Sequence, residues 1–207
     1  MVCARIFVLM KPRILEVVYA RHARAAWTKA IKPVSRELGF KPGRDQISGL
    51  PGWMRDADER RETFFFQINP YGFDKYSGGS FVVEFTSEDK RLRTWRRDRL
   101  WQLLDELSRR DAFNMNNRVI ESQPAPSTEF VESLRGPDRA WYLTKFEPVA
   151  QVPPPKTDFW FRYATQADAD WWGDFVASRL RWVLAESGTR LAHQPPGTSG
   201  GILGNEP

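Results

Sequence analysis

The sequence predicts an α+β domain in which a mainly antiparallel sheet of about five strands carries its helices largely on one face. The first observation is the order of elements: a helical pattern, three strand-like runs, a second helix, two more strand-like runs and a last helix. A parallel sheet would need regular alternation of strands and helices, which this order lacks. The second observation is a pair of aromatic and β-branched runs at residues 63–68 and 80–85. They flank a loop of Asn, Pro, Gly and Ser, which is typical of a β-hairpin.

The composition favours one folded domain. The 207 residues include nine Trp and fourteen Phe, enough large apolar side chains for a packed core without disulfides or metal. We predict an N-terminal extension at residues 1–10, a single domain at 11–186 and a disordered tail, rich in Gly, Pro, Ser and Thr, at 187–207. Met1 and Met10 are both candidate start residues.

Cysteine usage and charge set the expected compartment and partners. Cys3 is the single cysteine, so an intramolecular disulfide is excluded and the cytoplasm is the expected location. No window approaches the roughly 20 apolar residues of a membrane span. The 31 basic and 26 acidic residues leave a net charge of +5, which permits a polyanionic partner without requiring one.

Residues 11–38 predict the first helix, because apolar residues such as Trp27 recur at three-to-four-residue spacing with cations between them. Pro33 predicts a kink or the end of the first half, since proline lacks the amide donor and its ring clashes with the preceding turn. Gly39 predicts the C-terminal stop, with Phe40 returning to the core.

The next segment leads into the hairpin. We expect a loop at residues 41–52, a short strand at 53–55, a charged turn to residue 62 and then the two hairpin strands. In the second strand Phe81, Val83 and Phe85 alternate with Val82 and Glu84, so a helix should cover one face.

The C-terminal half predicts further helices and strands. In order, we expect a helix at 98–109 with Leu100, Leu103, Leu104 and Leu107 buried, a polar turn-rich segment at 114–126, one or two helical turns at 129–134, and strands at 141–146 and 159–163. Thr165 and Asp168 resemble a capping box at the start of the last helix. Gly188 predicts its end. The predicted apolar face of that helix comprises Trp172, Phe175, Val176, Leu180, Val183 and Leu184.

One segment resembles a known bacterial family. The run I-K-P-V-S-R-E-L-G-F at 31–40, followed by F-F-F-Q-I and S-F-V-V-E-F, is similar to the domain of unknown function 4304 family, in which a helix ends in a K-P-x-L-x-x-x-G-F pattern. The matching residues are Lys32, Pro33, Gly39, Phe40 and the strand residue Gln67, whereas Ser35 stands where the family has Leu. The resemblance covers about the first half of the chain and implies a bacterial protein, but no activity.

The loop between the hairpin strands is the first candidate functional segment. Tyr71, Phe73, Asp74 and Tyr76 lie beside the Gly78-Gly79 pair, and rigid rings beside flexible glycines suit contacts with a partner. The alternative is a loop that folds over the sheet with its rings packed inward.

The second candidate is the basic run at residues 90–99. Its cations and one ring could follow a phosphate backbone and stack on a base, which makes it a candidate nucleic-acid site. The alternative is the solvated start of a helix. The residues concerned are Arg91, Arg93, Trp95, Arg96 and Arg97.

Catalytic and metal-binding patterns are absent from the sequence. His22 and His193 are the only histidines, and neither has a second ligand at zinc spacing. Asp74, Glu88 and Lys90 only loosely imitate a magnesium-nuclease motif, because the last two are expected to lie past the strand end.

We therefore expect a non-enzymatic, cytoplasmic bacterial protein without cofactor or metal that acts through a protein partner, as an immunity- or regulator-like protein. The alternative is a nucleic-acid-binding accessory protein that uses residues 90–99.

Overall fold

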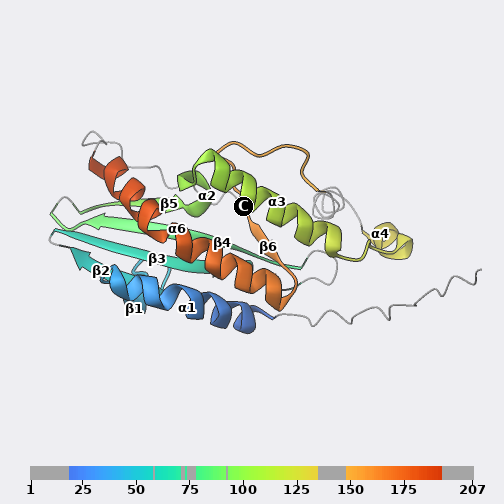
Figure 1. Cartoon of the computed structure of the whole chain (residues 1–207), viewed down its shortest axis with the longest axis horizontal. Coiled ribbons are helices and arrows are strands. Elements are labelled where there is room, and N and C mark those ends of the chain that lie inside the picture. The colour runs from blue at the N-terminus through green and yellow to red at the C-terminus, as the bar shows by residue number, and fades with distance from the viewer. Residues whose placement is uncertain are drawn as a thin grey trace, which may run out of the picture.

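The computed structural model describes residues 19–57, 59–70, 73, 78–91, 93–134 and 148–192. A long helix, an antiparallel sheet, shorter helices and a second long helix follow one another along the chain (Figure 1). The elements are α1 (Ala20–Glu37), β1 (Lys41–Arg44), β2 (Pro51–Ala57), β3 (Arg60–Ile68), β4 (Gly79–Asp89), β5 (Thr94–Arg99), α2 (Leu100–Leu103), α3 (Glu106–Ser122), α4 (Thr128–Ser133), β6 (Phe161–Tyr163) and α6 (Gln166–Ala192). The predicted α+β class is confirmed.

The described strands form one antiparallel sheet in the order β1-β2-β3-β4-β5, with β6 also paired to β4. The predicted hairpin is the β3–β4 pair, which extends from Arg60 opposite Asp89 to Ile68 opposite Phe81. On its other edge β4 pairs first with β6 and then with β5. The long strand β4 therefore joins β3 on one edge to β5 and β6 on the other.

Helices α1 and α6 lie side by side over one face of the sheet (Figure 1). Phe81 on β4 contacts Trp27 of α1, with ring centroids 4.2 Å apart, and Trp172 of α6, at 5.7 Å. Trp27 also stacks on Phe66 of β3 at 4.8 Å. Because all these rings are nearly or fully buried, this face forms the core, and the predicted helical cover of the Phe81 face is confirmed.

The end of α1 and the start of α6 lie where the sequence predicts them. Thr165 and Asp168 form the capping box: the Asp168 amide donates to the Thr165 hydroxyl at 3.2 Å, and the Asp168 carboxylate accepts from the Thr165 amide at 2.8 Å. Gly39 has a φ of 81° after α1, a conformation that favours glycine. Pro33 does not end α1, which continues to Glu37.

The turn between β1 and β2 covers part of the opposite face of the sheet. Asp45 in this turn accepts a hydrogen bond from the Thr86 hydroxyl of β4 at 3.1 Å. Since β3 lies between β2 and β4 in the sheet, this contact requires the turn to fold across β3. Val82 and Glu84, which alternate with the core residues of β4, are buried as well.

Residues 41–62 are more regular than predicted. The expected loop at 41–52 contains β1 and the start of β2, and β3 begins at Arg60 inside the expected charged turn. Pro42 is compatible with a strand because β1 is at the sheet edge. At Gly52 a Cβ atom would lie 2.4 Å from the Phe64 carbonyl oxygen, so this glycine permits a close approach of β2 to β3.

The helix predicted at 98–109 has the wrong bounds. Residues up to Arg99 belong to β5, the four-residue α2 follows, and α3 then continues to Ser122 through the predicted polar segment. Asp105 separates the two helices because its carboxylate accepts the Ser108 amide at 2.7 Å as an N-cap. The interruption changes the helical phase, so Leu107 is 73% exposed instead of buried.

The remaining predictions have mixed outcomes. The helical turns at 129–134 and the last strand are confirmed as α4 and β6, whereas α6 continues beyond Gly188 to Ala192. Trp171 packs against Phe175 on α6, with ring centroids 5.0 Å apart. The strand predicted at 141–146, the segment 1–10 and the tail beyond 192 lie outside the described residues. None of the described helices combines the length and apolarity that a membrane crossing needs.

The contact between α1 and α6 gives a first prediction. A Cβ at Gly173 would lie 3.0 Å from the Ala30 Cβ and 3.4 Å from the Ala26 carbonyl oxygen. Gly173→Leu should therefore force the helices apart and lower the free energy of unfolding by about 1–3 kcal/mol, measured by urea denaturation. Asp174→Leu, at the exposed neighbouring position, is the control and should change it by less than about 0.5 kcal/mol. Equal losses in both variants would contradict the close contact.

Tyr163 gives a second prediction. Burial raises the pKa of Tyr163 to about 12, above the ordinary value of 10, because the charged phenolate is poorly solvated there. A pKa raised in the folded state contributes stability that is complete below pH 10 and is lost as the pH rises towards 12. An absorbance titration of phenolate should therefore show a step near pH 12 that Tyr163→Phe lacks. An unchanged titration in this variant would contradict the assignment.

Candidate functional site

The hairpin loop is only partly described. Tyr71, Asp74 and Tyr76 of the predicted partner-binding set lie outside the described residues, while Phe73 is half-buried. The partner-binding role of this loop, and its alternative of a loop packed over the sheet, therefore stay predictions.

The predicted nucleic-acid-binding residues lie on β5 and on the turn before it, not at the start of a helix. Arg91 and Arg93 are in the turn, where Arg93 has a φ of 53°. Trp95, Arg96 and Arg97 are on β5. Trp95 is 53% exposed, so it is available to a partner.

Most of the cations in this segment are paired with carboxylates. Arg91 contacts Glu59 at 3.1 Å, and Arg96 contacts Asp98 at 2.8 Å. Arg97 pairs with Glu84. The fold thus places Glu59 and Glu84 beside a run that is strongly basic in the sequence, Asp98 lies within the run itself, and these carboxylates lower the free positive charge there.

Two further details support this neutralisation. Lys90 Nζ lies 2.7 Å from Asp56, and the hydrogen bonds from Lys90 and then Arg61 lower the pKa of the Asp56 carboxyl. Glu88 belongs to β4, so the expectation that it lies past the strand end is wrong. Its carboxylate faces Arg61 at 4.0 Å.

Glu84 is the centre of a buried charge cluster. Its side chain is fully buried and pairs with both Arg97 and Arg99, and Arg99 also pairs with Asp158. The Arg97 guanidinium lies 5.8 Å from the centre of the Phe65 ring. These arginines hold β5 to β4, which indicates a structural role for their charge.

The outer face of α1 carries a different set of cations. They recur at helical spacing, they are all exposed, and α1 has no acidic residue before Glu37. Among the described residues none of them forms an ion pair. We call this set the α1 cation row: Arg21, Arg24, Lys29, Lys32 and Arg36.

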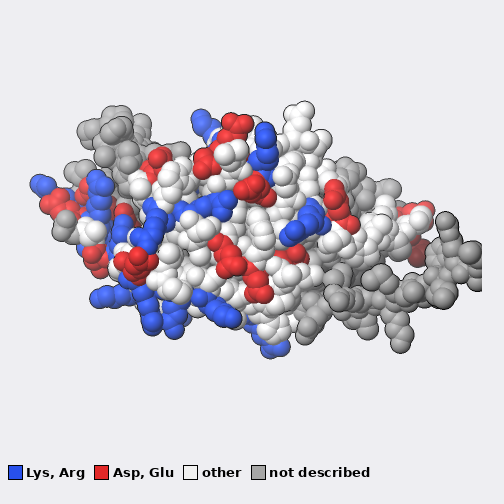
Figure 2. Space-filling model, in the orientation of Figure 1, with Lys and Arg blue, Asp and Glu red and all other residues white. Residues whose placement is uncertain are grey.

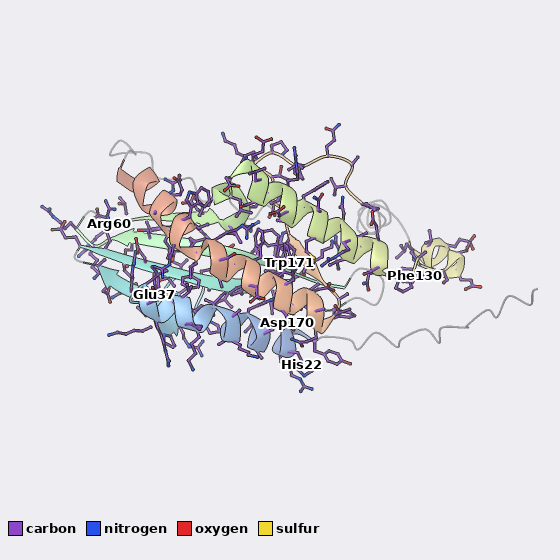
Figure 3. The ribbon with its side chains drawn as sticks, viewed as in Figure 1. His22, Glu37, Arg60, Phe130, Asp170 and Trp171 are labelled. Carbon is purple, nitrogen blue, oxygen red and sulfur yellow. The ribbon has the colours of Figure 1, made fainter. Side chains whose placement is uncertain are left out.

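The figures show the same arrangement. In Figure 2 Lys and Arg gather along the lower edge, where α1 lies. In Figure 3 long side chains extend from the outer side of α1, between His22 and Glu37, away from the sheet. The row spans about 22 Å, because a helix rises about 1.5 Å per residue.

A pocket of about 300 Å³ lies between α1 and the β1–β2 hairpin. Its apolar walls are the rings of Trp27, Phe40, Trp53 and Phe66 together with Pro42 and Pro51. Its remaining lining residues are Gly52, Thr28 and three members of the α1 cation row, Arg24, Lys32 and Arg36. The lining contains no carboxylate, so the pocket combines aromatic walls with a purely cationic rim.

Local structure explains why this pocket forms. Trp53 points to the helix side of β2 and stacks on Phe64, with ring centroids 5.0 Å apart. Phe40 follows the Gly39 turn, which brings the chain from α1 back to the sheet. Gly43 and Gly52 face each other across β1 and β2, and a Cβ at Gly43 would lie 2.3 Å from the Met54 sulfur, so this glycine leaves room for the Met54 side chain.

Sequence reasoning missed this site, although its signal was present. Residues 20–36 contain five cations of Lys or Arg and no Asp or Glu. The sequence predicts the helix, with these cations between its core residues, but helical spacing alone does not separate a solvated face from a binding surface. The pocket had no such signal, because its wall came from a segment predicted to be a loop.

The other potential sites carry little chemistry. His22 lies on α1 and accepts a hydrogen bond from Arg21 Nε at 3.2 Å, while His193 and Cys3 lie outside the described residues. Within the described ranges no group of three or more His, Cys, Asp or Glu side chains could hold a metal ion. A wide hollow of about 780 Å³ beside α2 and α6 mixes acids and bases, including the Arg96–Asp98 pair.

Comparisons with family models, curated proteins and solved structures find no match to this chain. The resemblance of Lys32, Pro33, Gly39 and Phe40 to the domain of unknown function 4304 family therefore stays a prediction.

The buried cluster gives a third prediction. Glu84→Ala leaves Arg97 and Arg99 without their shared carboxylate and should lower the free energy of unfolding by about 2–4 kcal/mol, since breaking a buried pair is costly but both arginines retain some solvent contact. Glu59→Ala removes the exposed partner of Arg91 and should cost less than about 1 kcal/mol. Urea denaturation measures both, and a loss for Glu84→Ala no larger than that for Glu59→Ala would contradict the structural role.

Proposed function

We propose that the protein is a non-enzymatic binding protein that holds single-stranded nucleic acid on the surface formed by α1 and the β1–β2 hairpin. The observation that carries the proposal is the α1 cation row, which has no carboxylate partner within the described chain and borders a pocket with aromatic walls. In this proposal the α1 cation row and its pocket, and not the basic run at residues 90–99, form the main contact surface.

Charge supports a polyanionic partner. Five exposed cations on one helical face repel one another, and an approaching anion relieves that repulsion. A phosphate backbone offers repeated negative charges, and its binding releases counterions. Arg24, Thr28, Lys32 and Arg36 follow one another at intervals of four residues, about 6 Å along the helix, so successive groups can contact an extended strand.

The pocket favours nucleic acid over an acidic protein. Surfaces for single-stranded nucleic acid combine a positive groove with aromatic side chains that accept bases. An acidic peptide would pair with the cations but would leave the cavity beside them unfilled. A protein partner, as the sequence analysis proposed for an immunity- or regulator-like protein, remains the second candidate, supported by the exposed apolar side chains Leu107 and Trp182.

The fourth prediction tests the α1 cation row. Fluorescence anisotropy with a labelled single-stranded oligonucleotide should show binding that weakens with salt, with a logarithmic slope of about −3 if most of the row is engaged. Arg21→Gln/Lys29→Gln removes two cations outside the pocket and should reduce the steepness of that slope by about 1.4.

The control is Arg91→Gln/Arg93→Gln, which removes the same charge from the segment before β5 and should change affinity much less. The reverse result, with the larger loss in the control, would return the site to residues 90–99. Absence of salt-dependent binding at low salt would overturn the proposed function. Binding to polyglutamate alone would then indicate an acidic protein partner.

A further inference from the structure

We infer that the pocket between α1 and the β1–β2 hairpin is a base-binding subsite, which accepts one nucleobase while the phosphates beside it lie on Arg24, Lys32 and Arg36. The inference rests on the proposed function, because the same surface supplies the phosphate contacts. It adds that the chain distinguishes nucleic acid from other polyanions by holding a ring.

The size of the pocket suits a single ring system. At about 300 Å³ it is at the small end of the range for sites that hold small ligands. It therefore has room for one base, whereas its neighbours on the strand would stay outside along the cation row.

The pocket walls suit a flat, largely apolar group. Trp53, Phe66 and Phe40 are at most 9% exposed and are held by the core behind them. Trp53 stacks on Phe64, and Phe40 contacts the Phe64 ring at 5.1 Å between centroids. These rings are consequently fixed before any ligand arrives, and the small exposed parts of Trp53 and Phe66 are the aromatic surface that a base would contact.

A polar group of the lining suits the edge of a base. The Thr28 hydroxyl is exposed on α1 beside the pocket, and a hydroxyl can donate or accept.

The positions of the cations indicate on which side of the pocket the phosphate of a ligand would lie. The three cations lie on α1, on one side of the pocket, whereas the opposite side is formed by Pro42, Pro51 and Gly52. A base attached to a phosphate fits this asymmetry, since its ring enters between the walls while its charge stays on the helix side.

The experiment compares two single-stranded oligonucleotides of equal length and phosphate count, one carrying bases and one abasic throughout. The wild-type protein should bind the base-carrying strand about 5- to 150-fold more tightly, the range expected for one stacked base. Thr28→Phe places a ring over the pocket and should abolish this preference, because the base can no longer enter, while the abasic strand still binds through the α1 cation row.

Ala25→Phe is the matched control: it places the same ring at an exposed position of α1 that does not line the pocket, so the preference should be kept. Thermal unfolding of both variants checks that they fold. Equal binding of the two strands by the wild-type protein overturns the base-binding subsite and leaves the proposed function intact. A preference that survives in Thr28→Phe overturns the location of the subsite, and absence of binding by either strand overturns the proposed function itself.

Discussion

The packing around Phe81 is the interaction on which the rest of the structure depends. This ring on β4 contacts Trp27 from α1, Phe161 from β6 and Trp172 from α6, with the centroids of the first pair 4.2 Å apart. Elements that are distant in the sequence therefore meet at one side chain. Since rings must pack closely to exclude water, the positions of both long helices on the sheet follow from this contact.

Antiparallel strand pairing explains why the arginines of β5 have carboxylate partners whereas the α1 cation row has none among the described residues. A strand acquires neighbours on its edges, so Arg97 and Arg99 on β5 come to lie beside Glu84 on β4. A helix at the margin of the sheet has an outer side without such neighbours, and Lys32 on α1 has no described carboxylate near enough to pair. Positive charge in a sequence thus predicts a binding surface only after the neighbours of each cation are known.

Local signals predicted the β3–β4 hairpin, the end of α1 and the start of α6, whereas the end of α6 at Gly188 and the segments governed by distant contacts were predicted poorly. Gly39 and the Thr165–Asp168 box act within a few residues, so both were recognised from the sequence. β1 and the start of β2 were missed because Pro42 and Gly52 are typical of loops, and only the pairing of β1 with β2 and of β2 with β3 makes them strand residues. The candidate pocket depends on these pairings, so no local sequence pattern indicates it.

The hydrogen bonds of Asp45 have a consequence for the entropy of binding. Its carboxylate accepts from Thr86 on β4 and from the Ser48 amide and hydroxyl at 2.6 and 2.8 Å within its own turn. The hairpin that supplies Pro42 and Pro51 is thereby closed and tied to the opposite side of the sheet. A ligand held against it has little backbone motion to suppress, so association loses less conformational freedom than it would on an untethered loop.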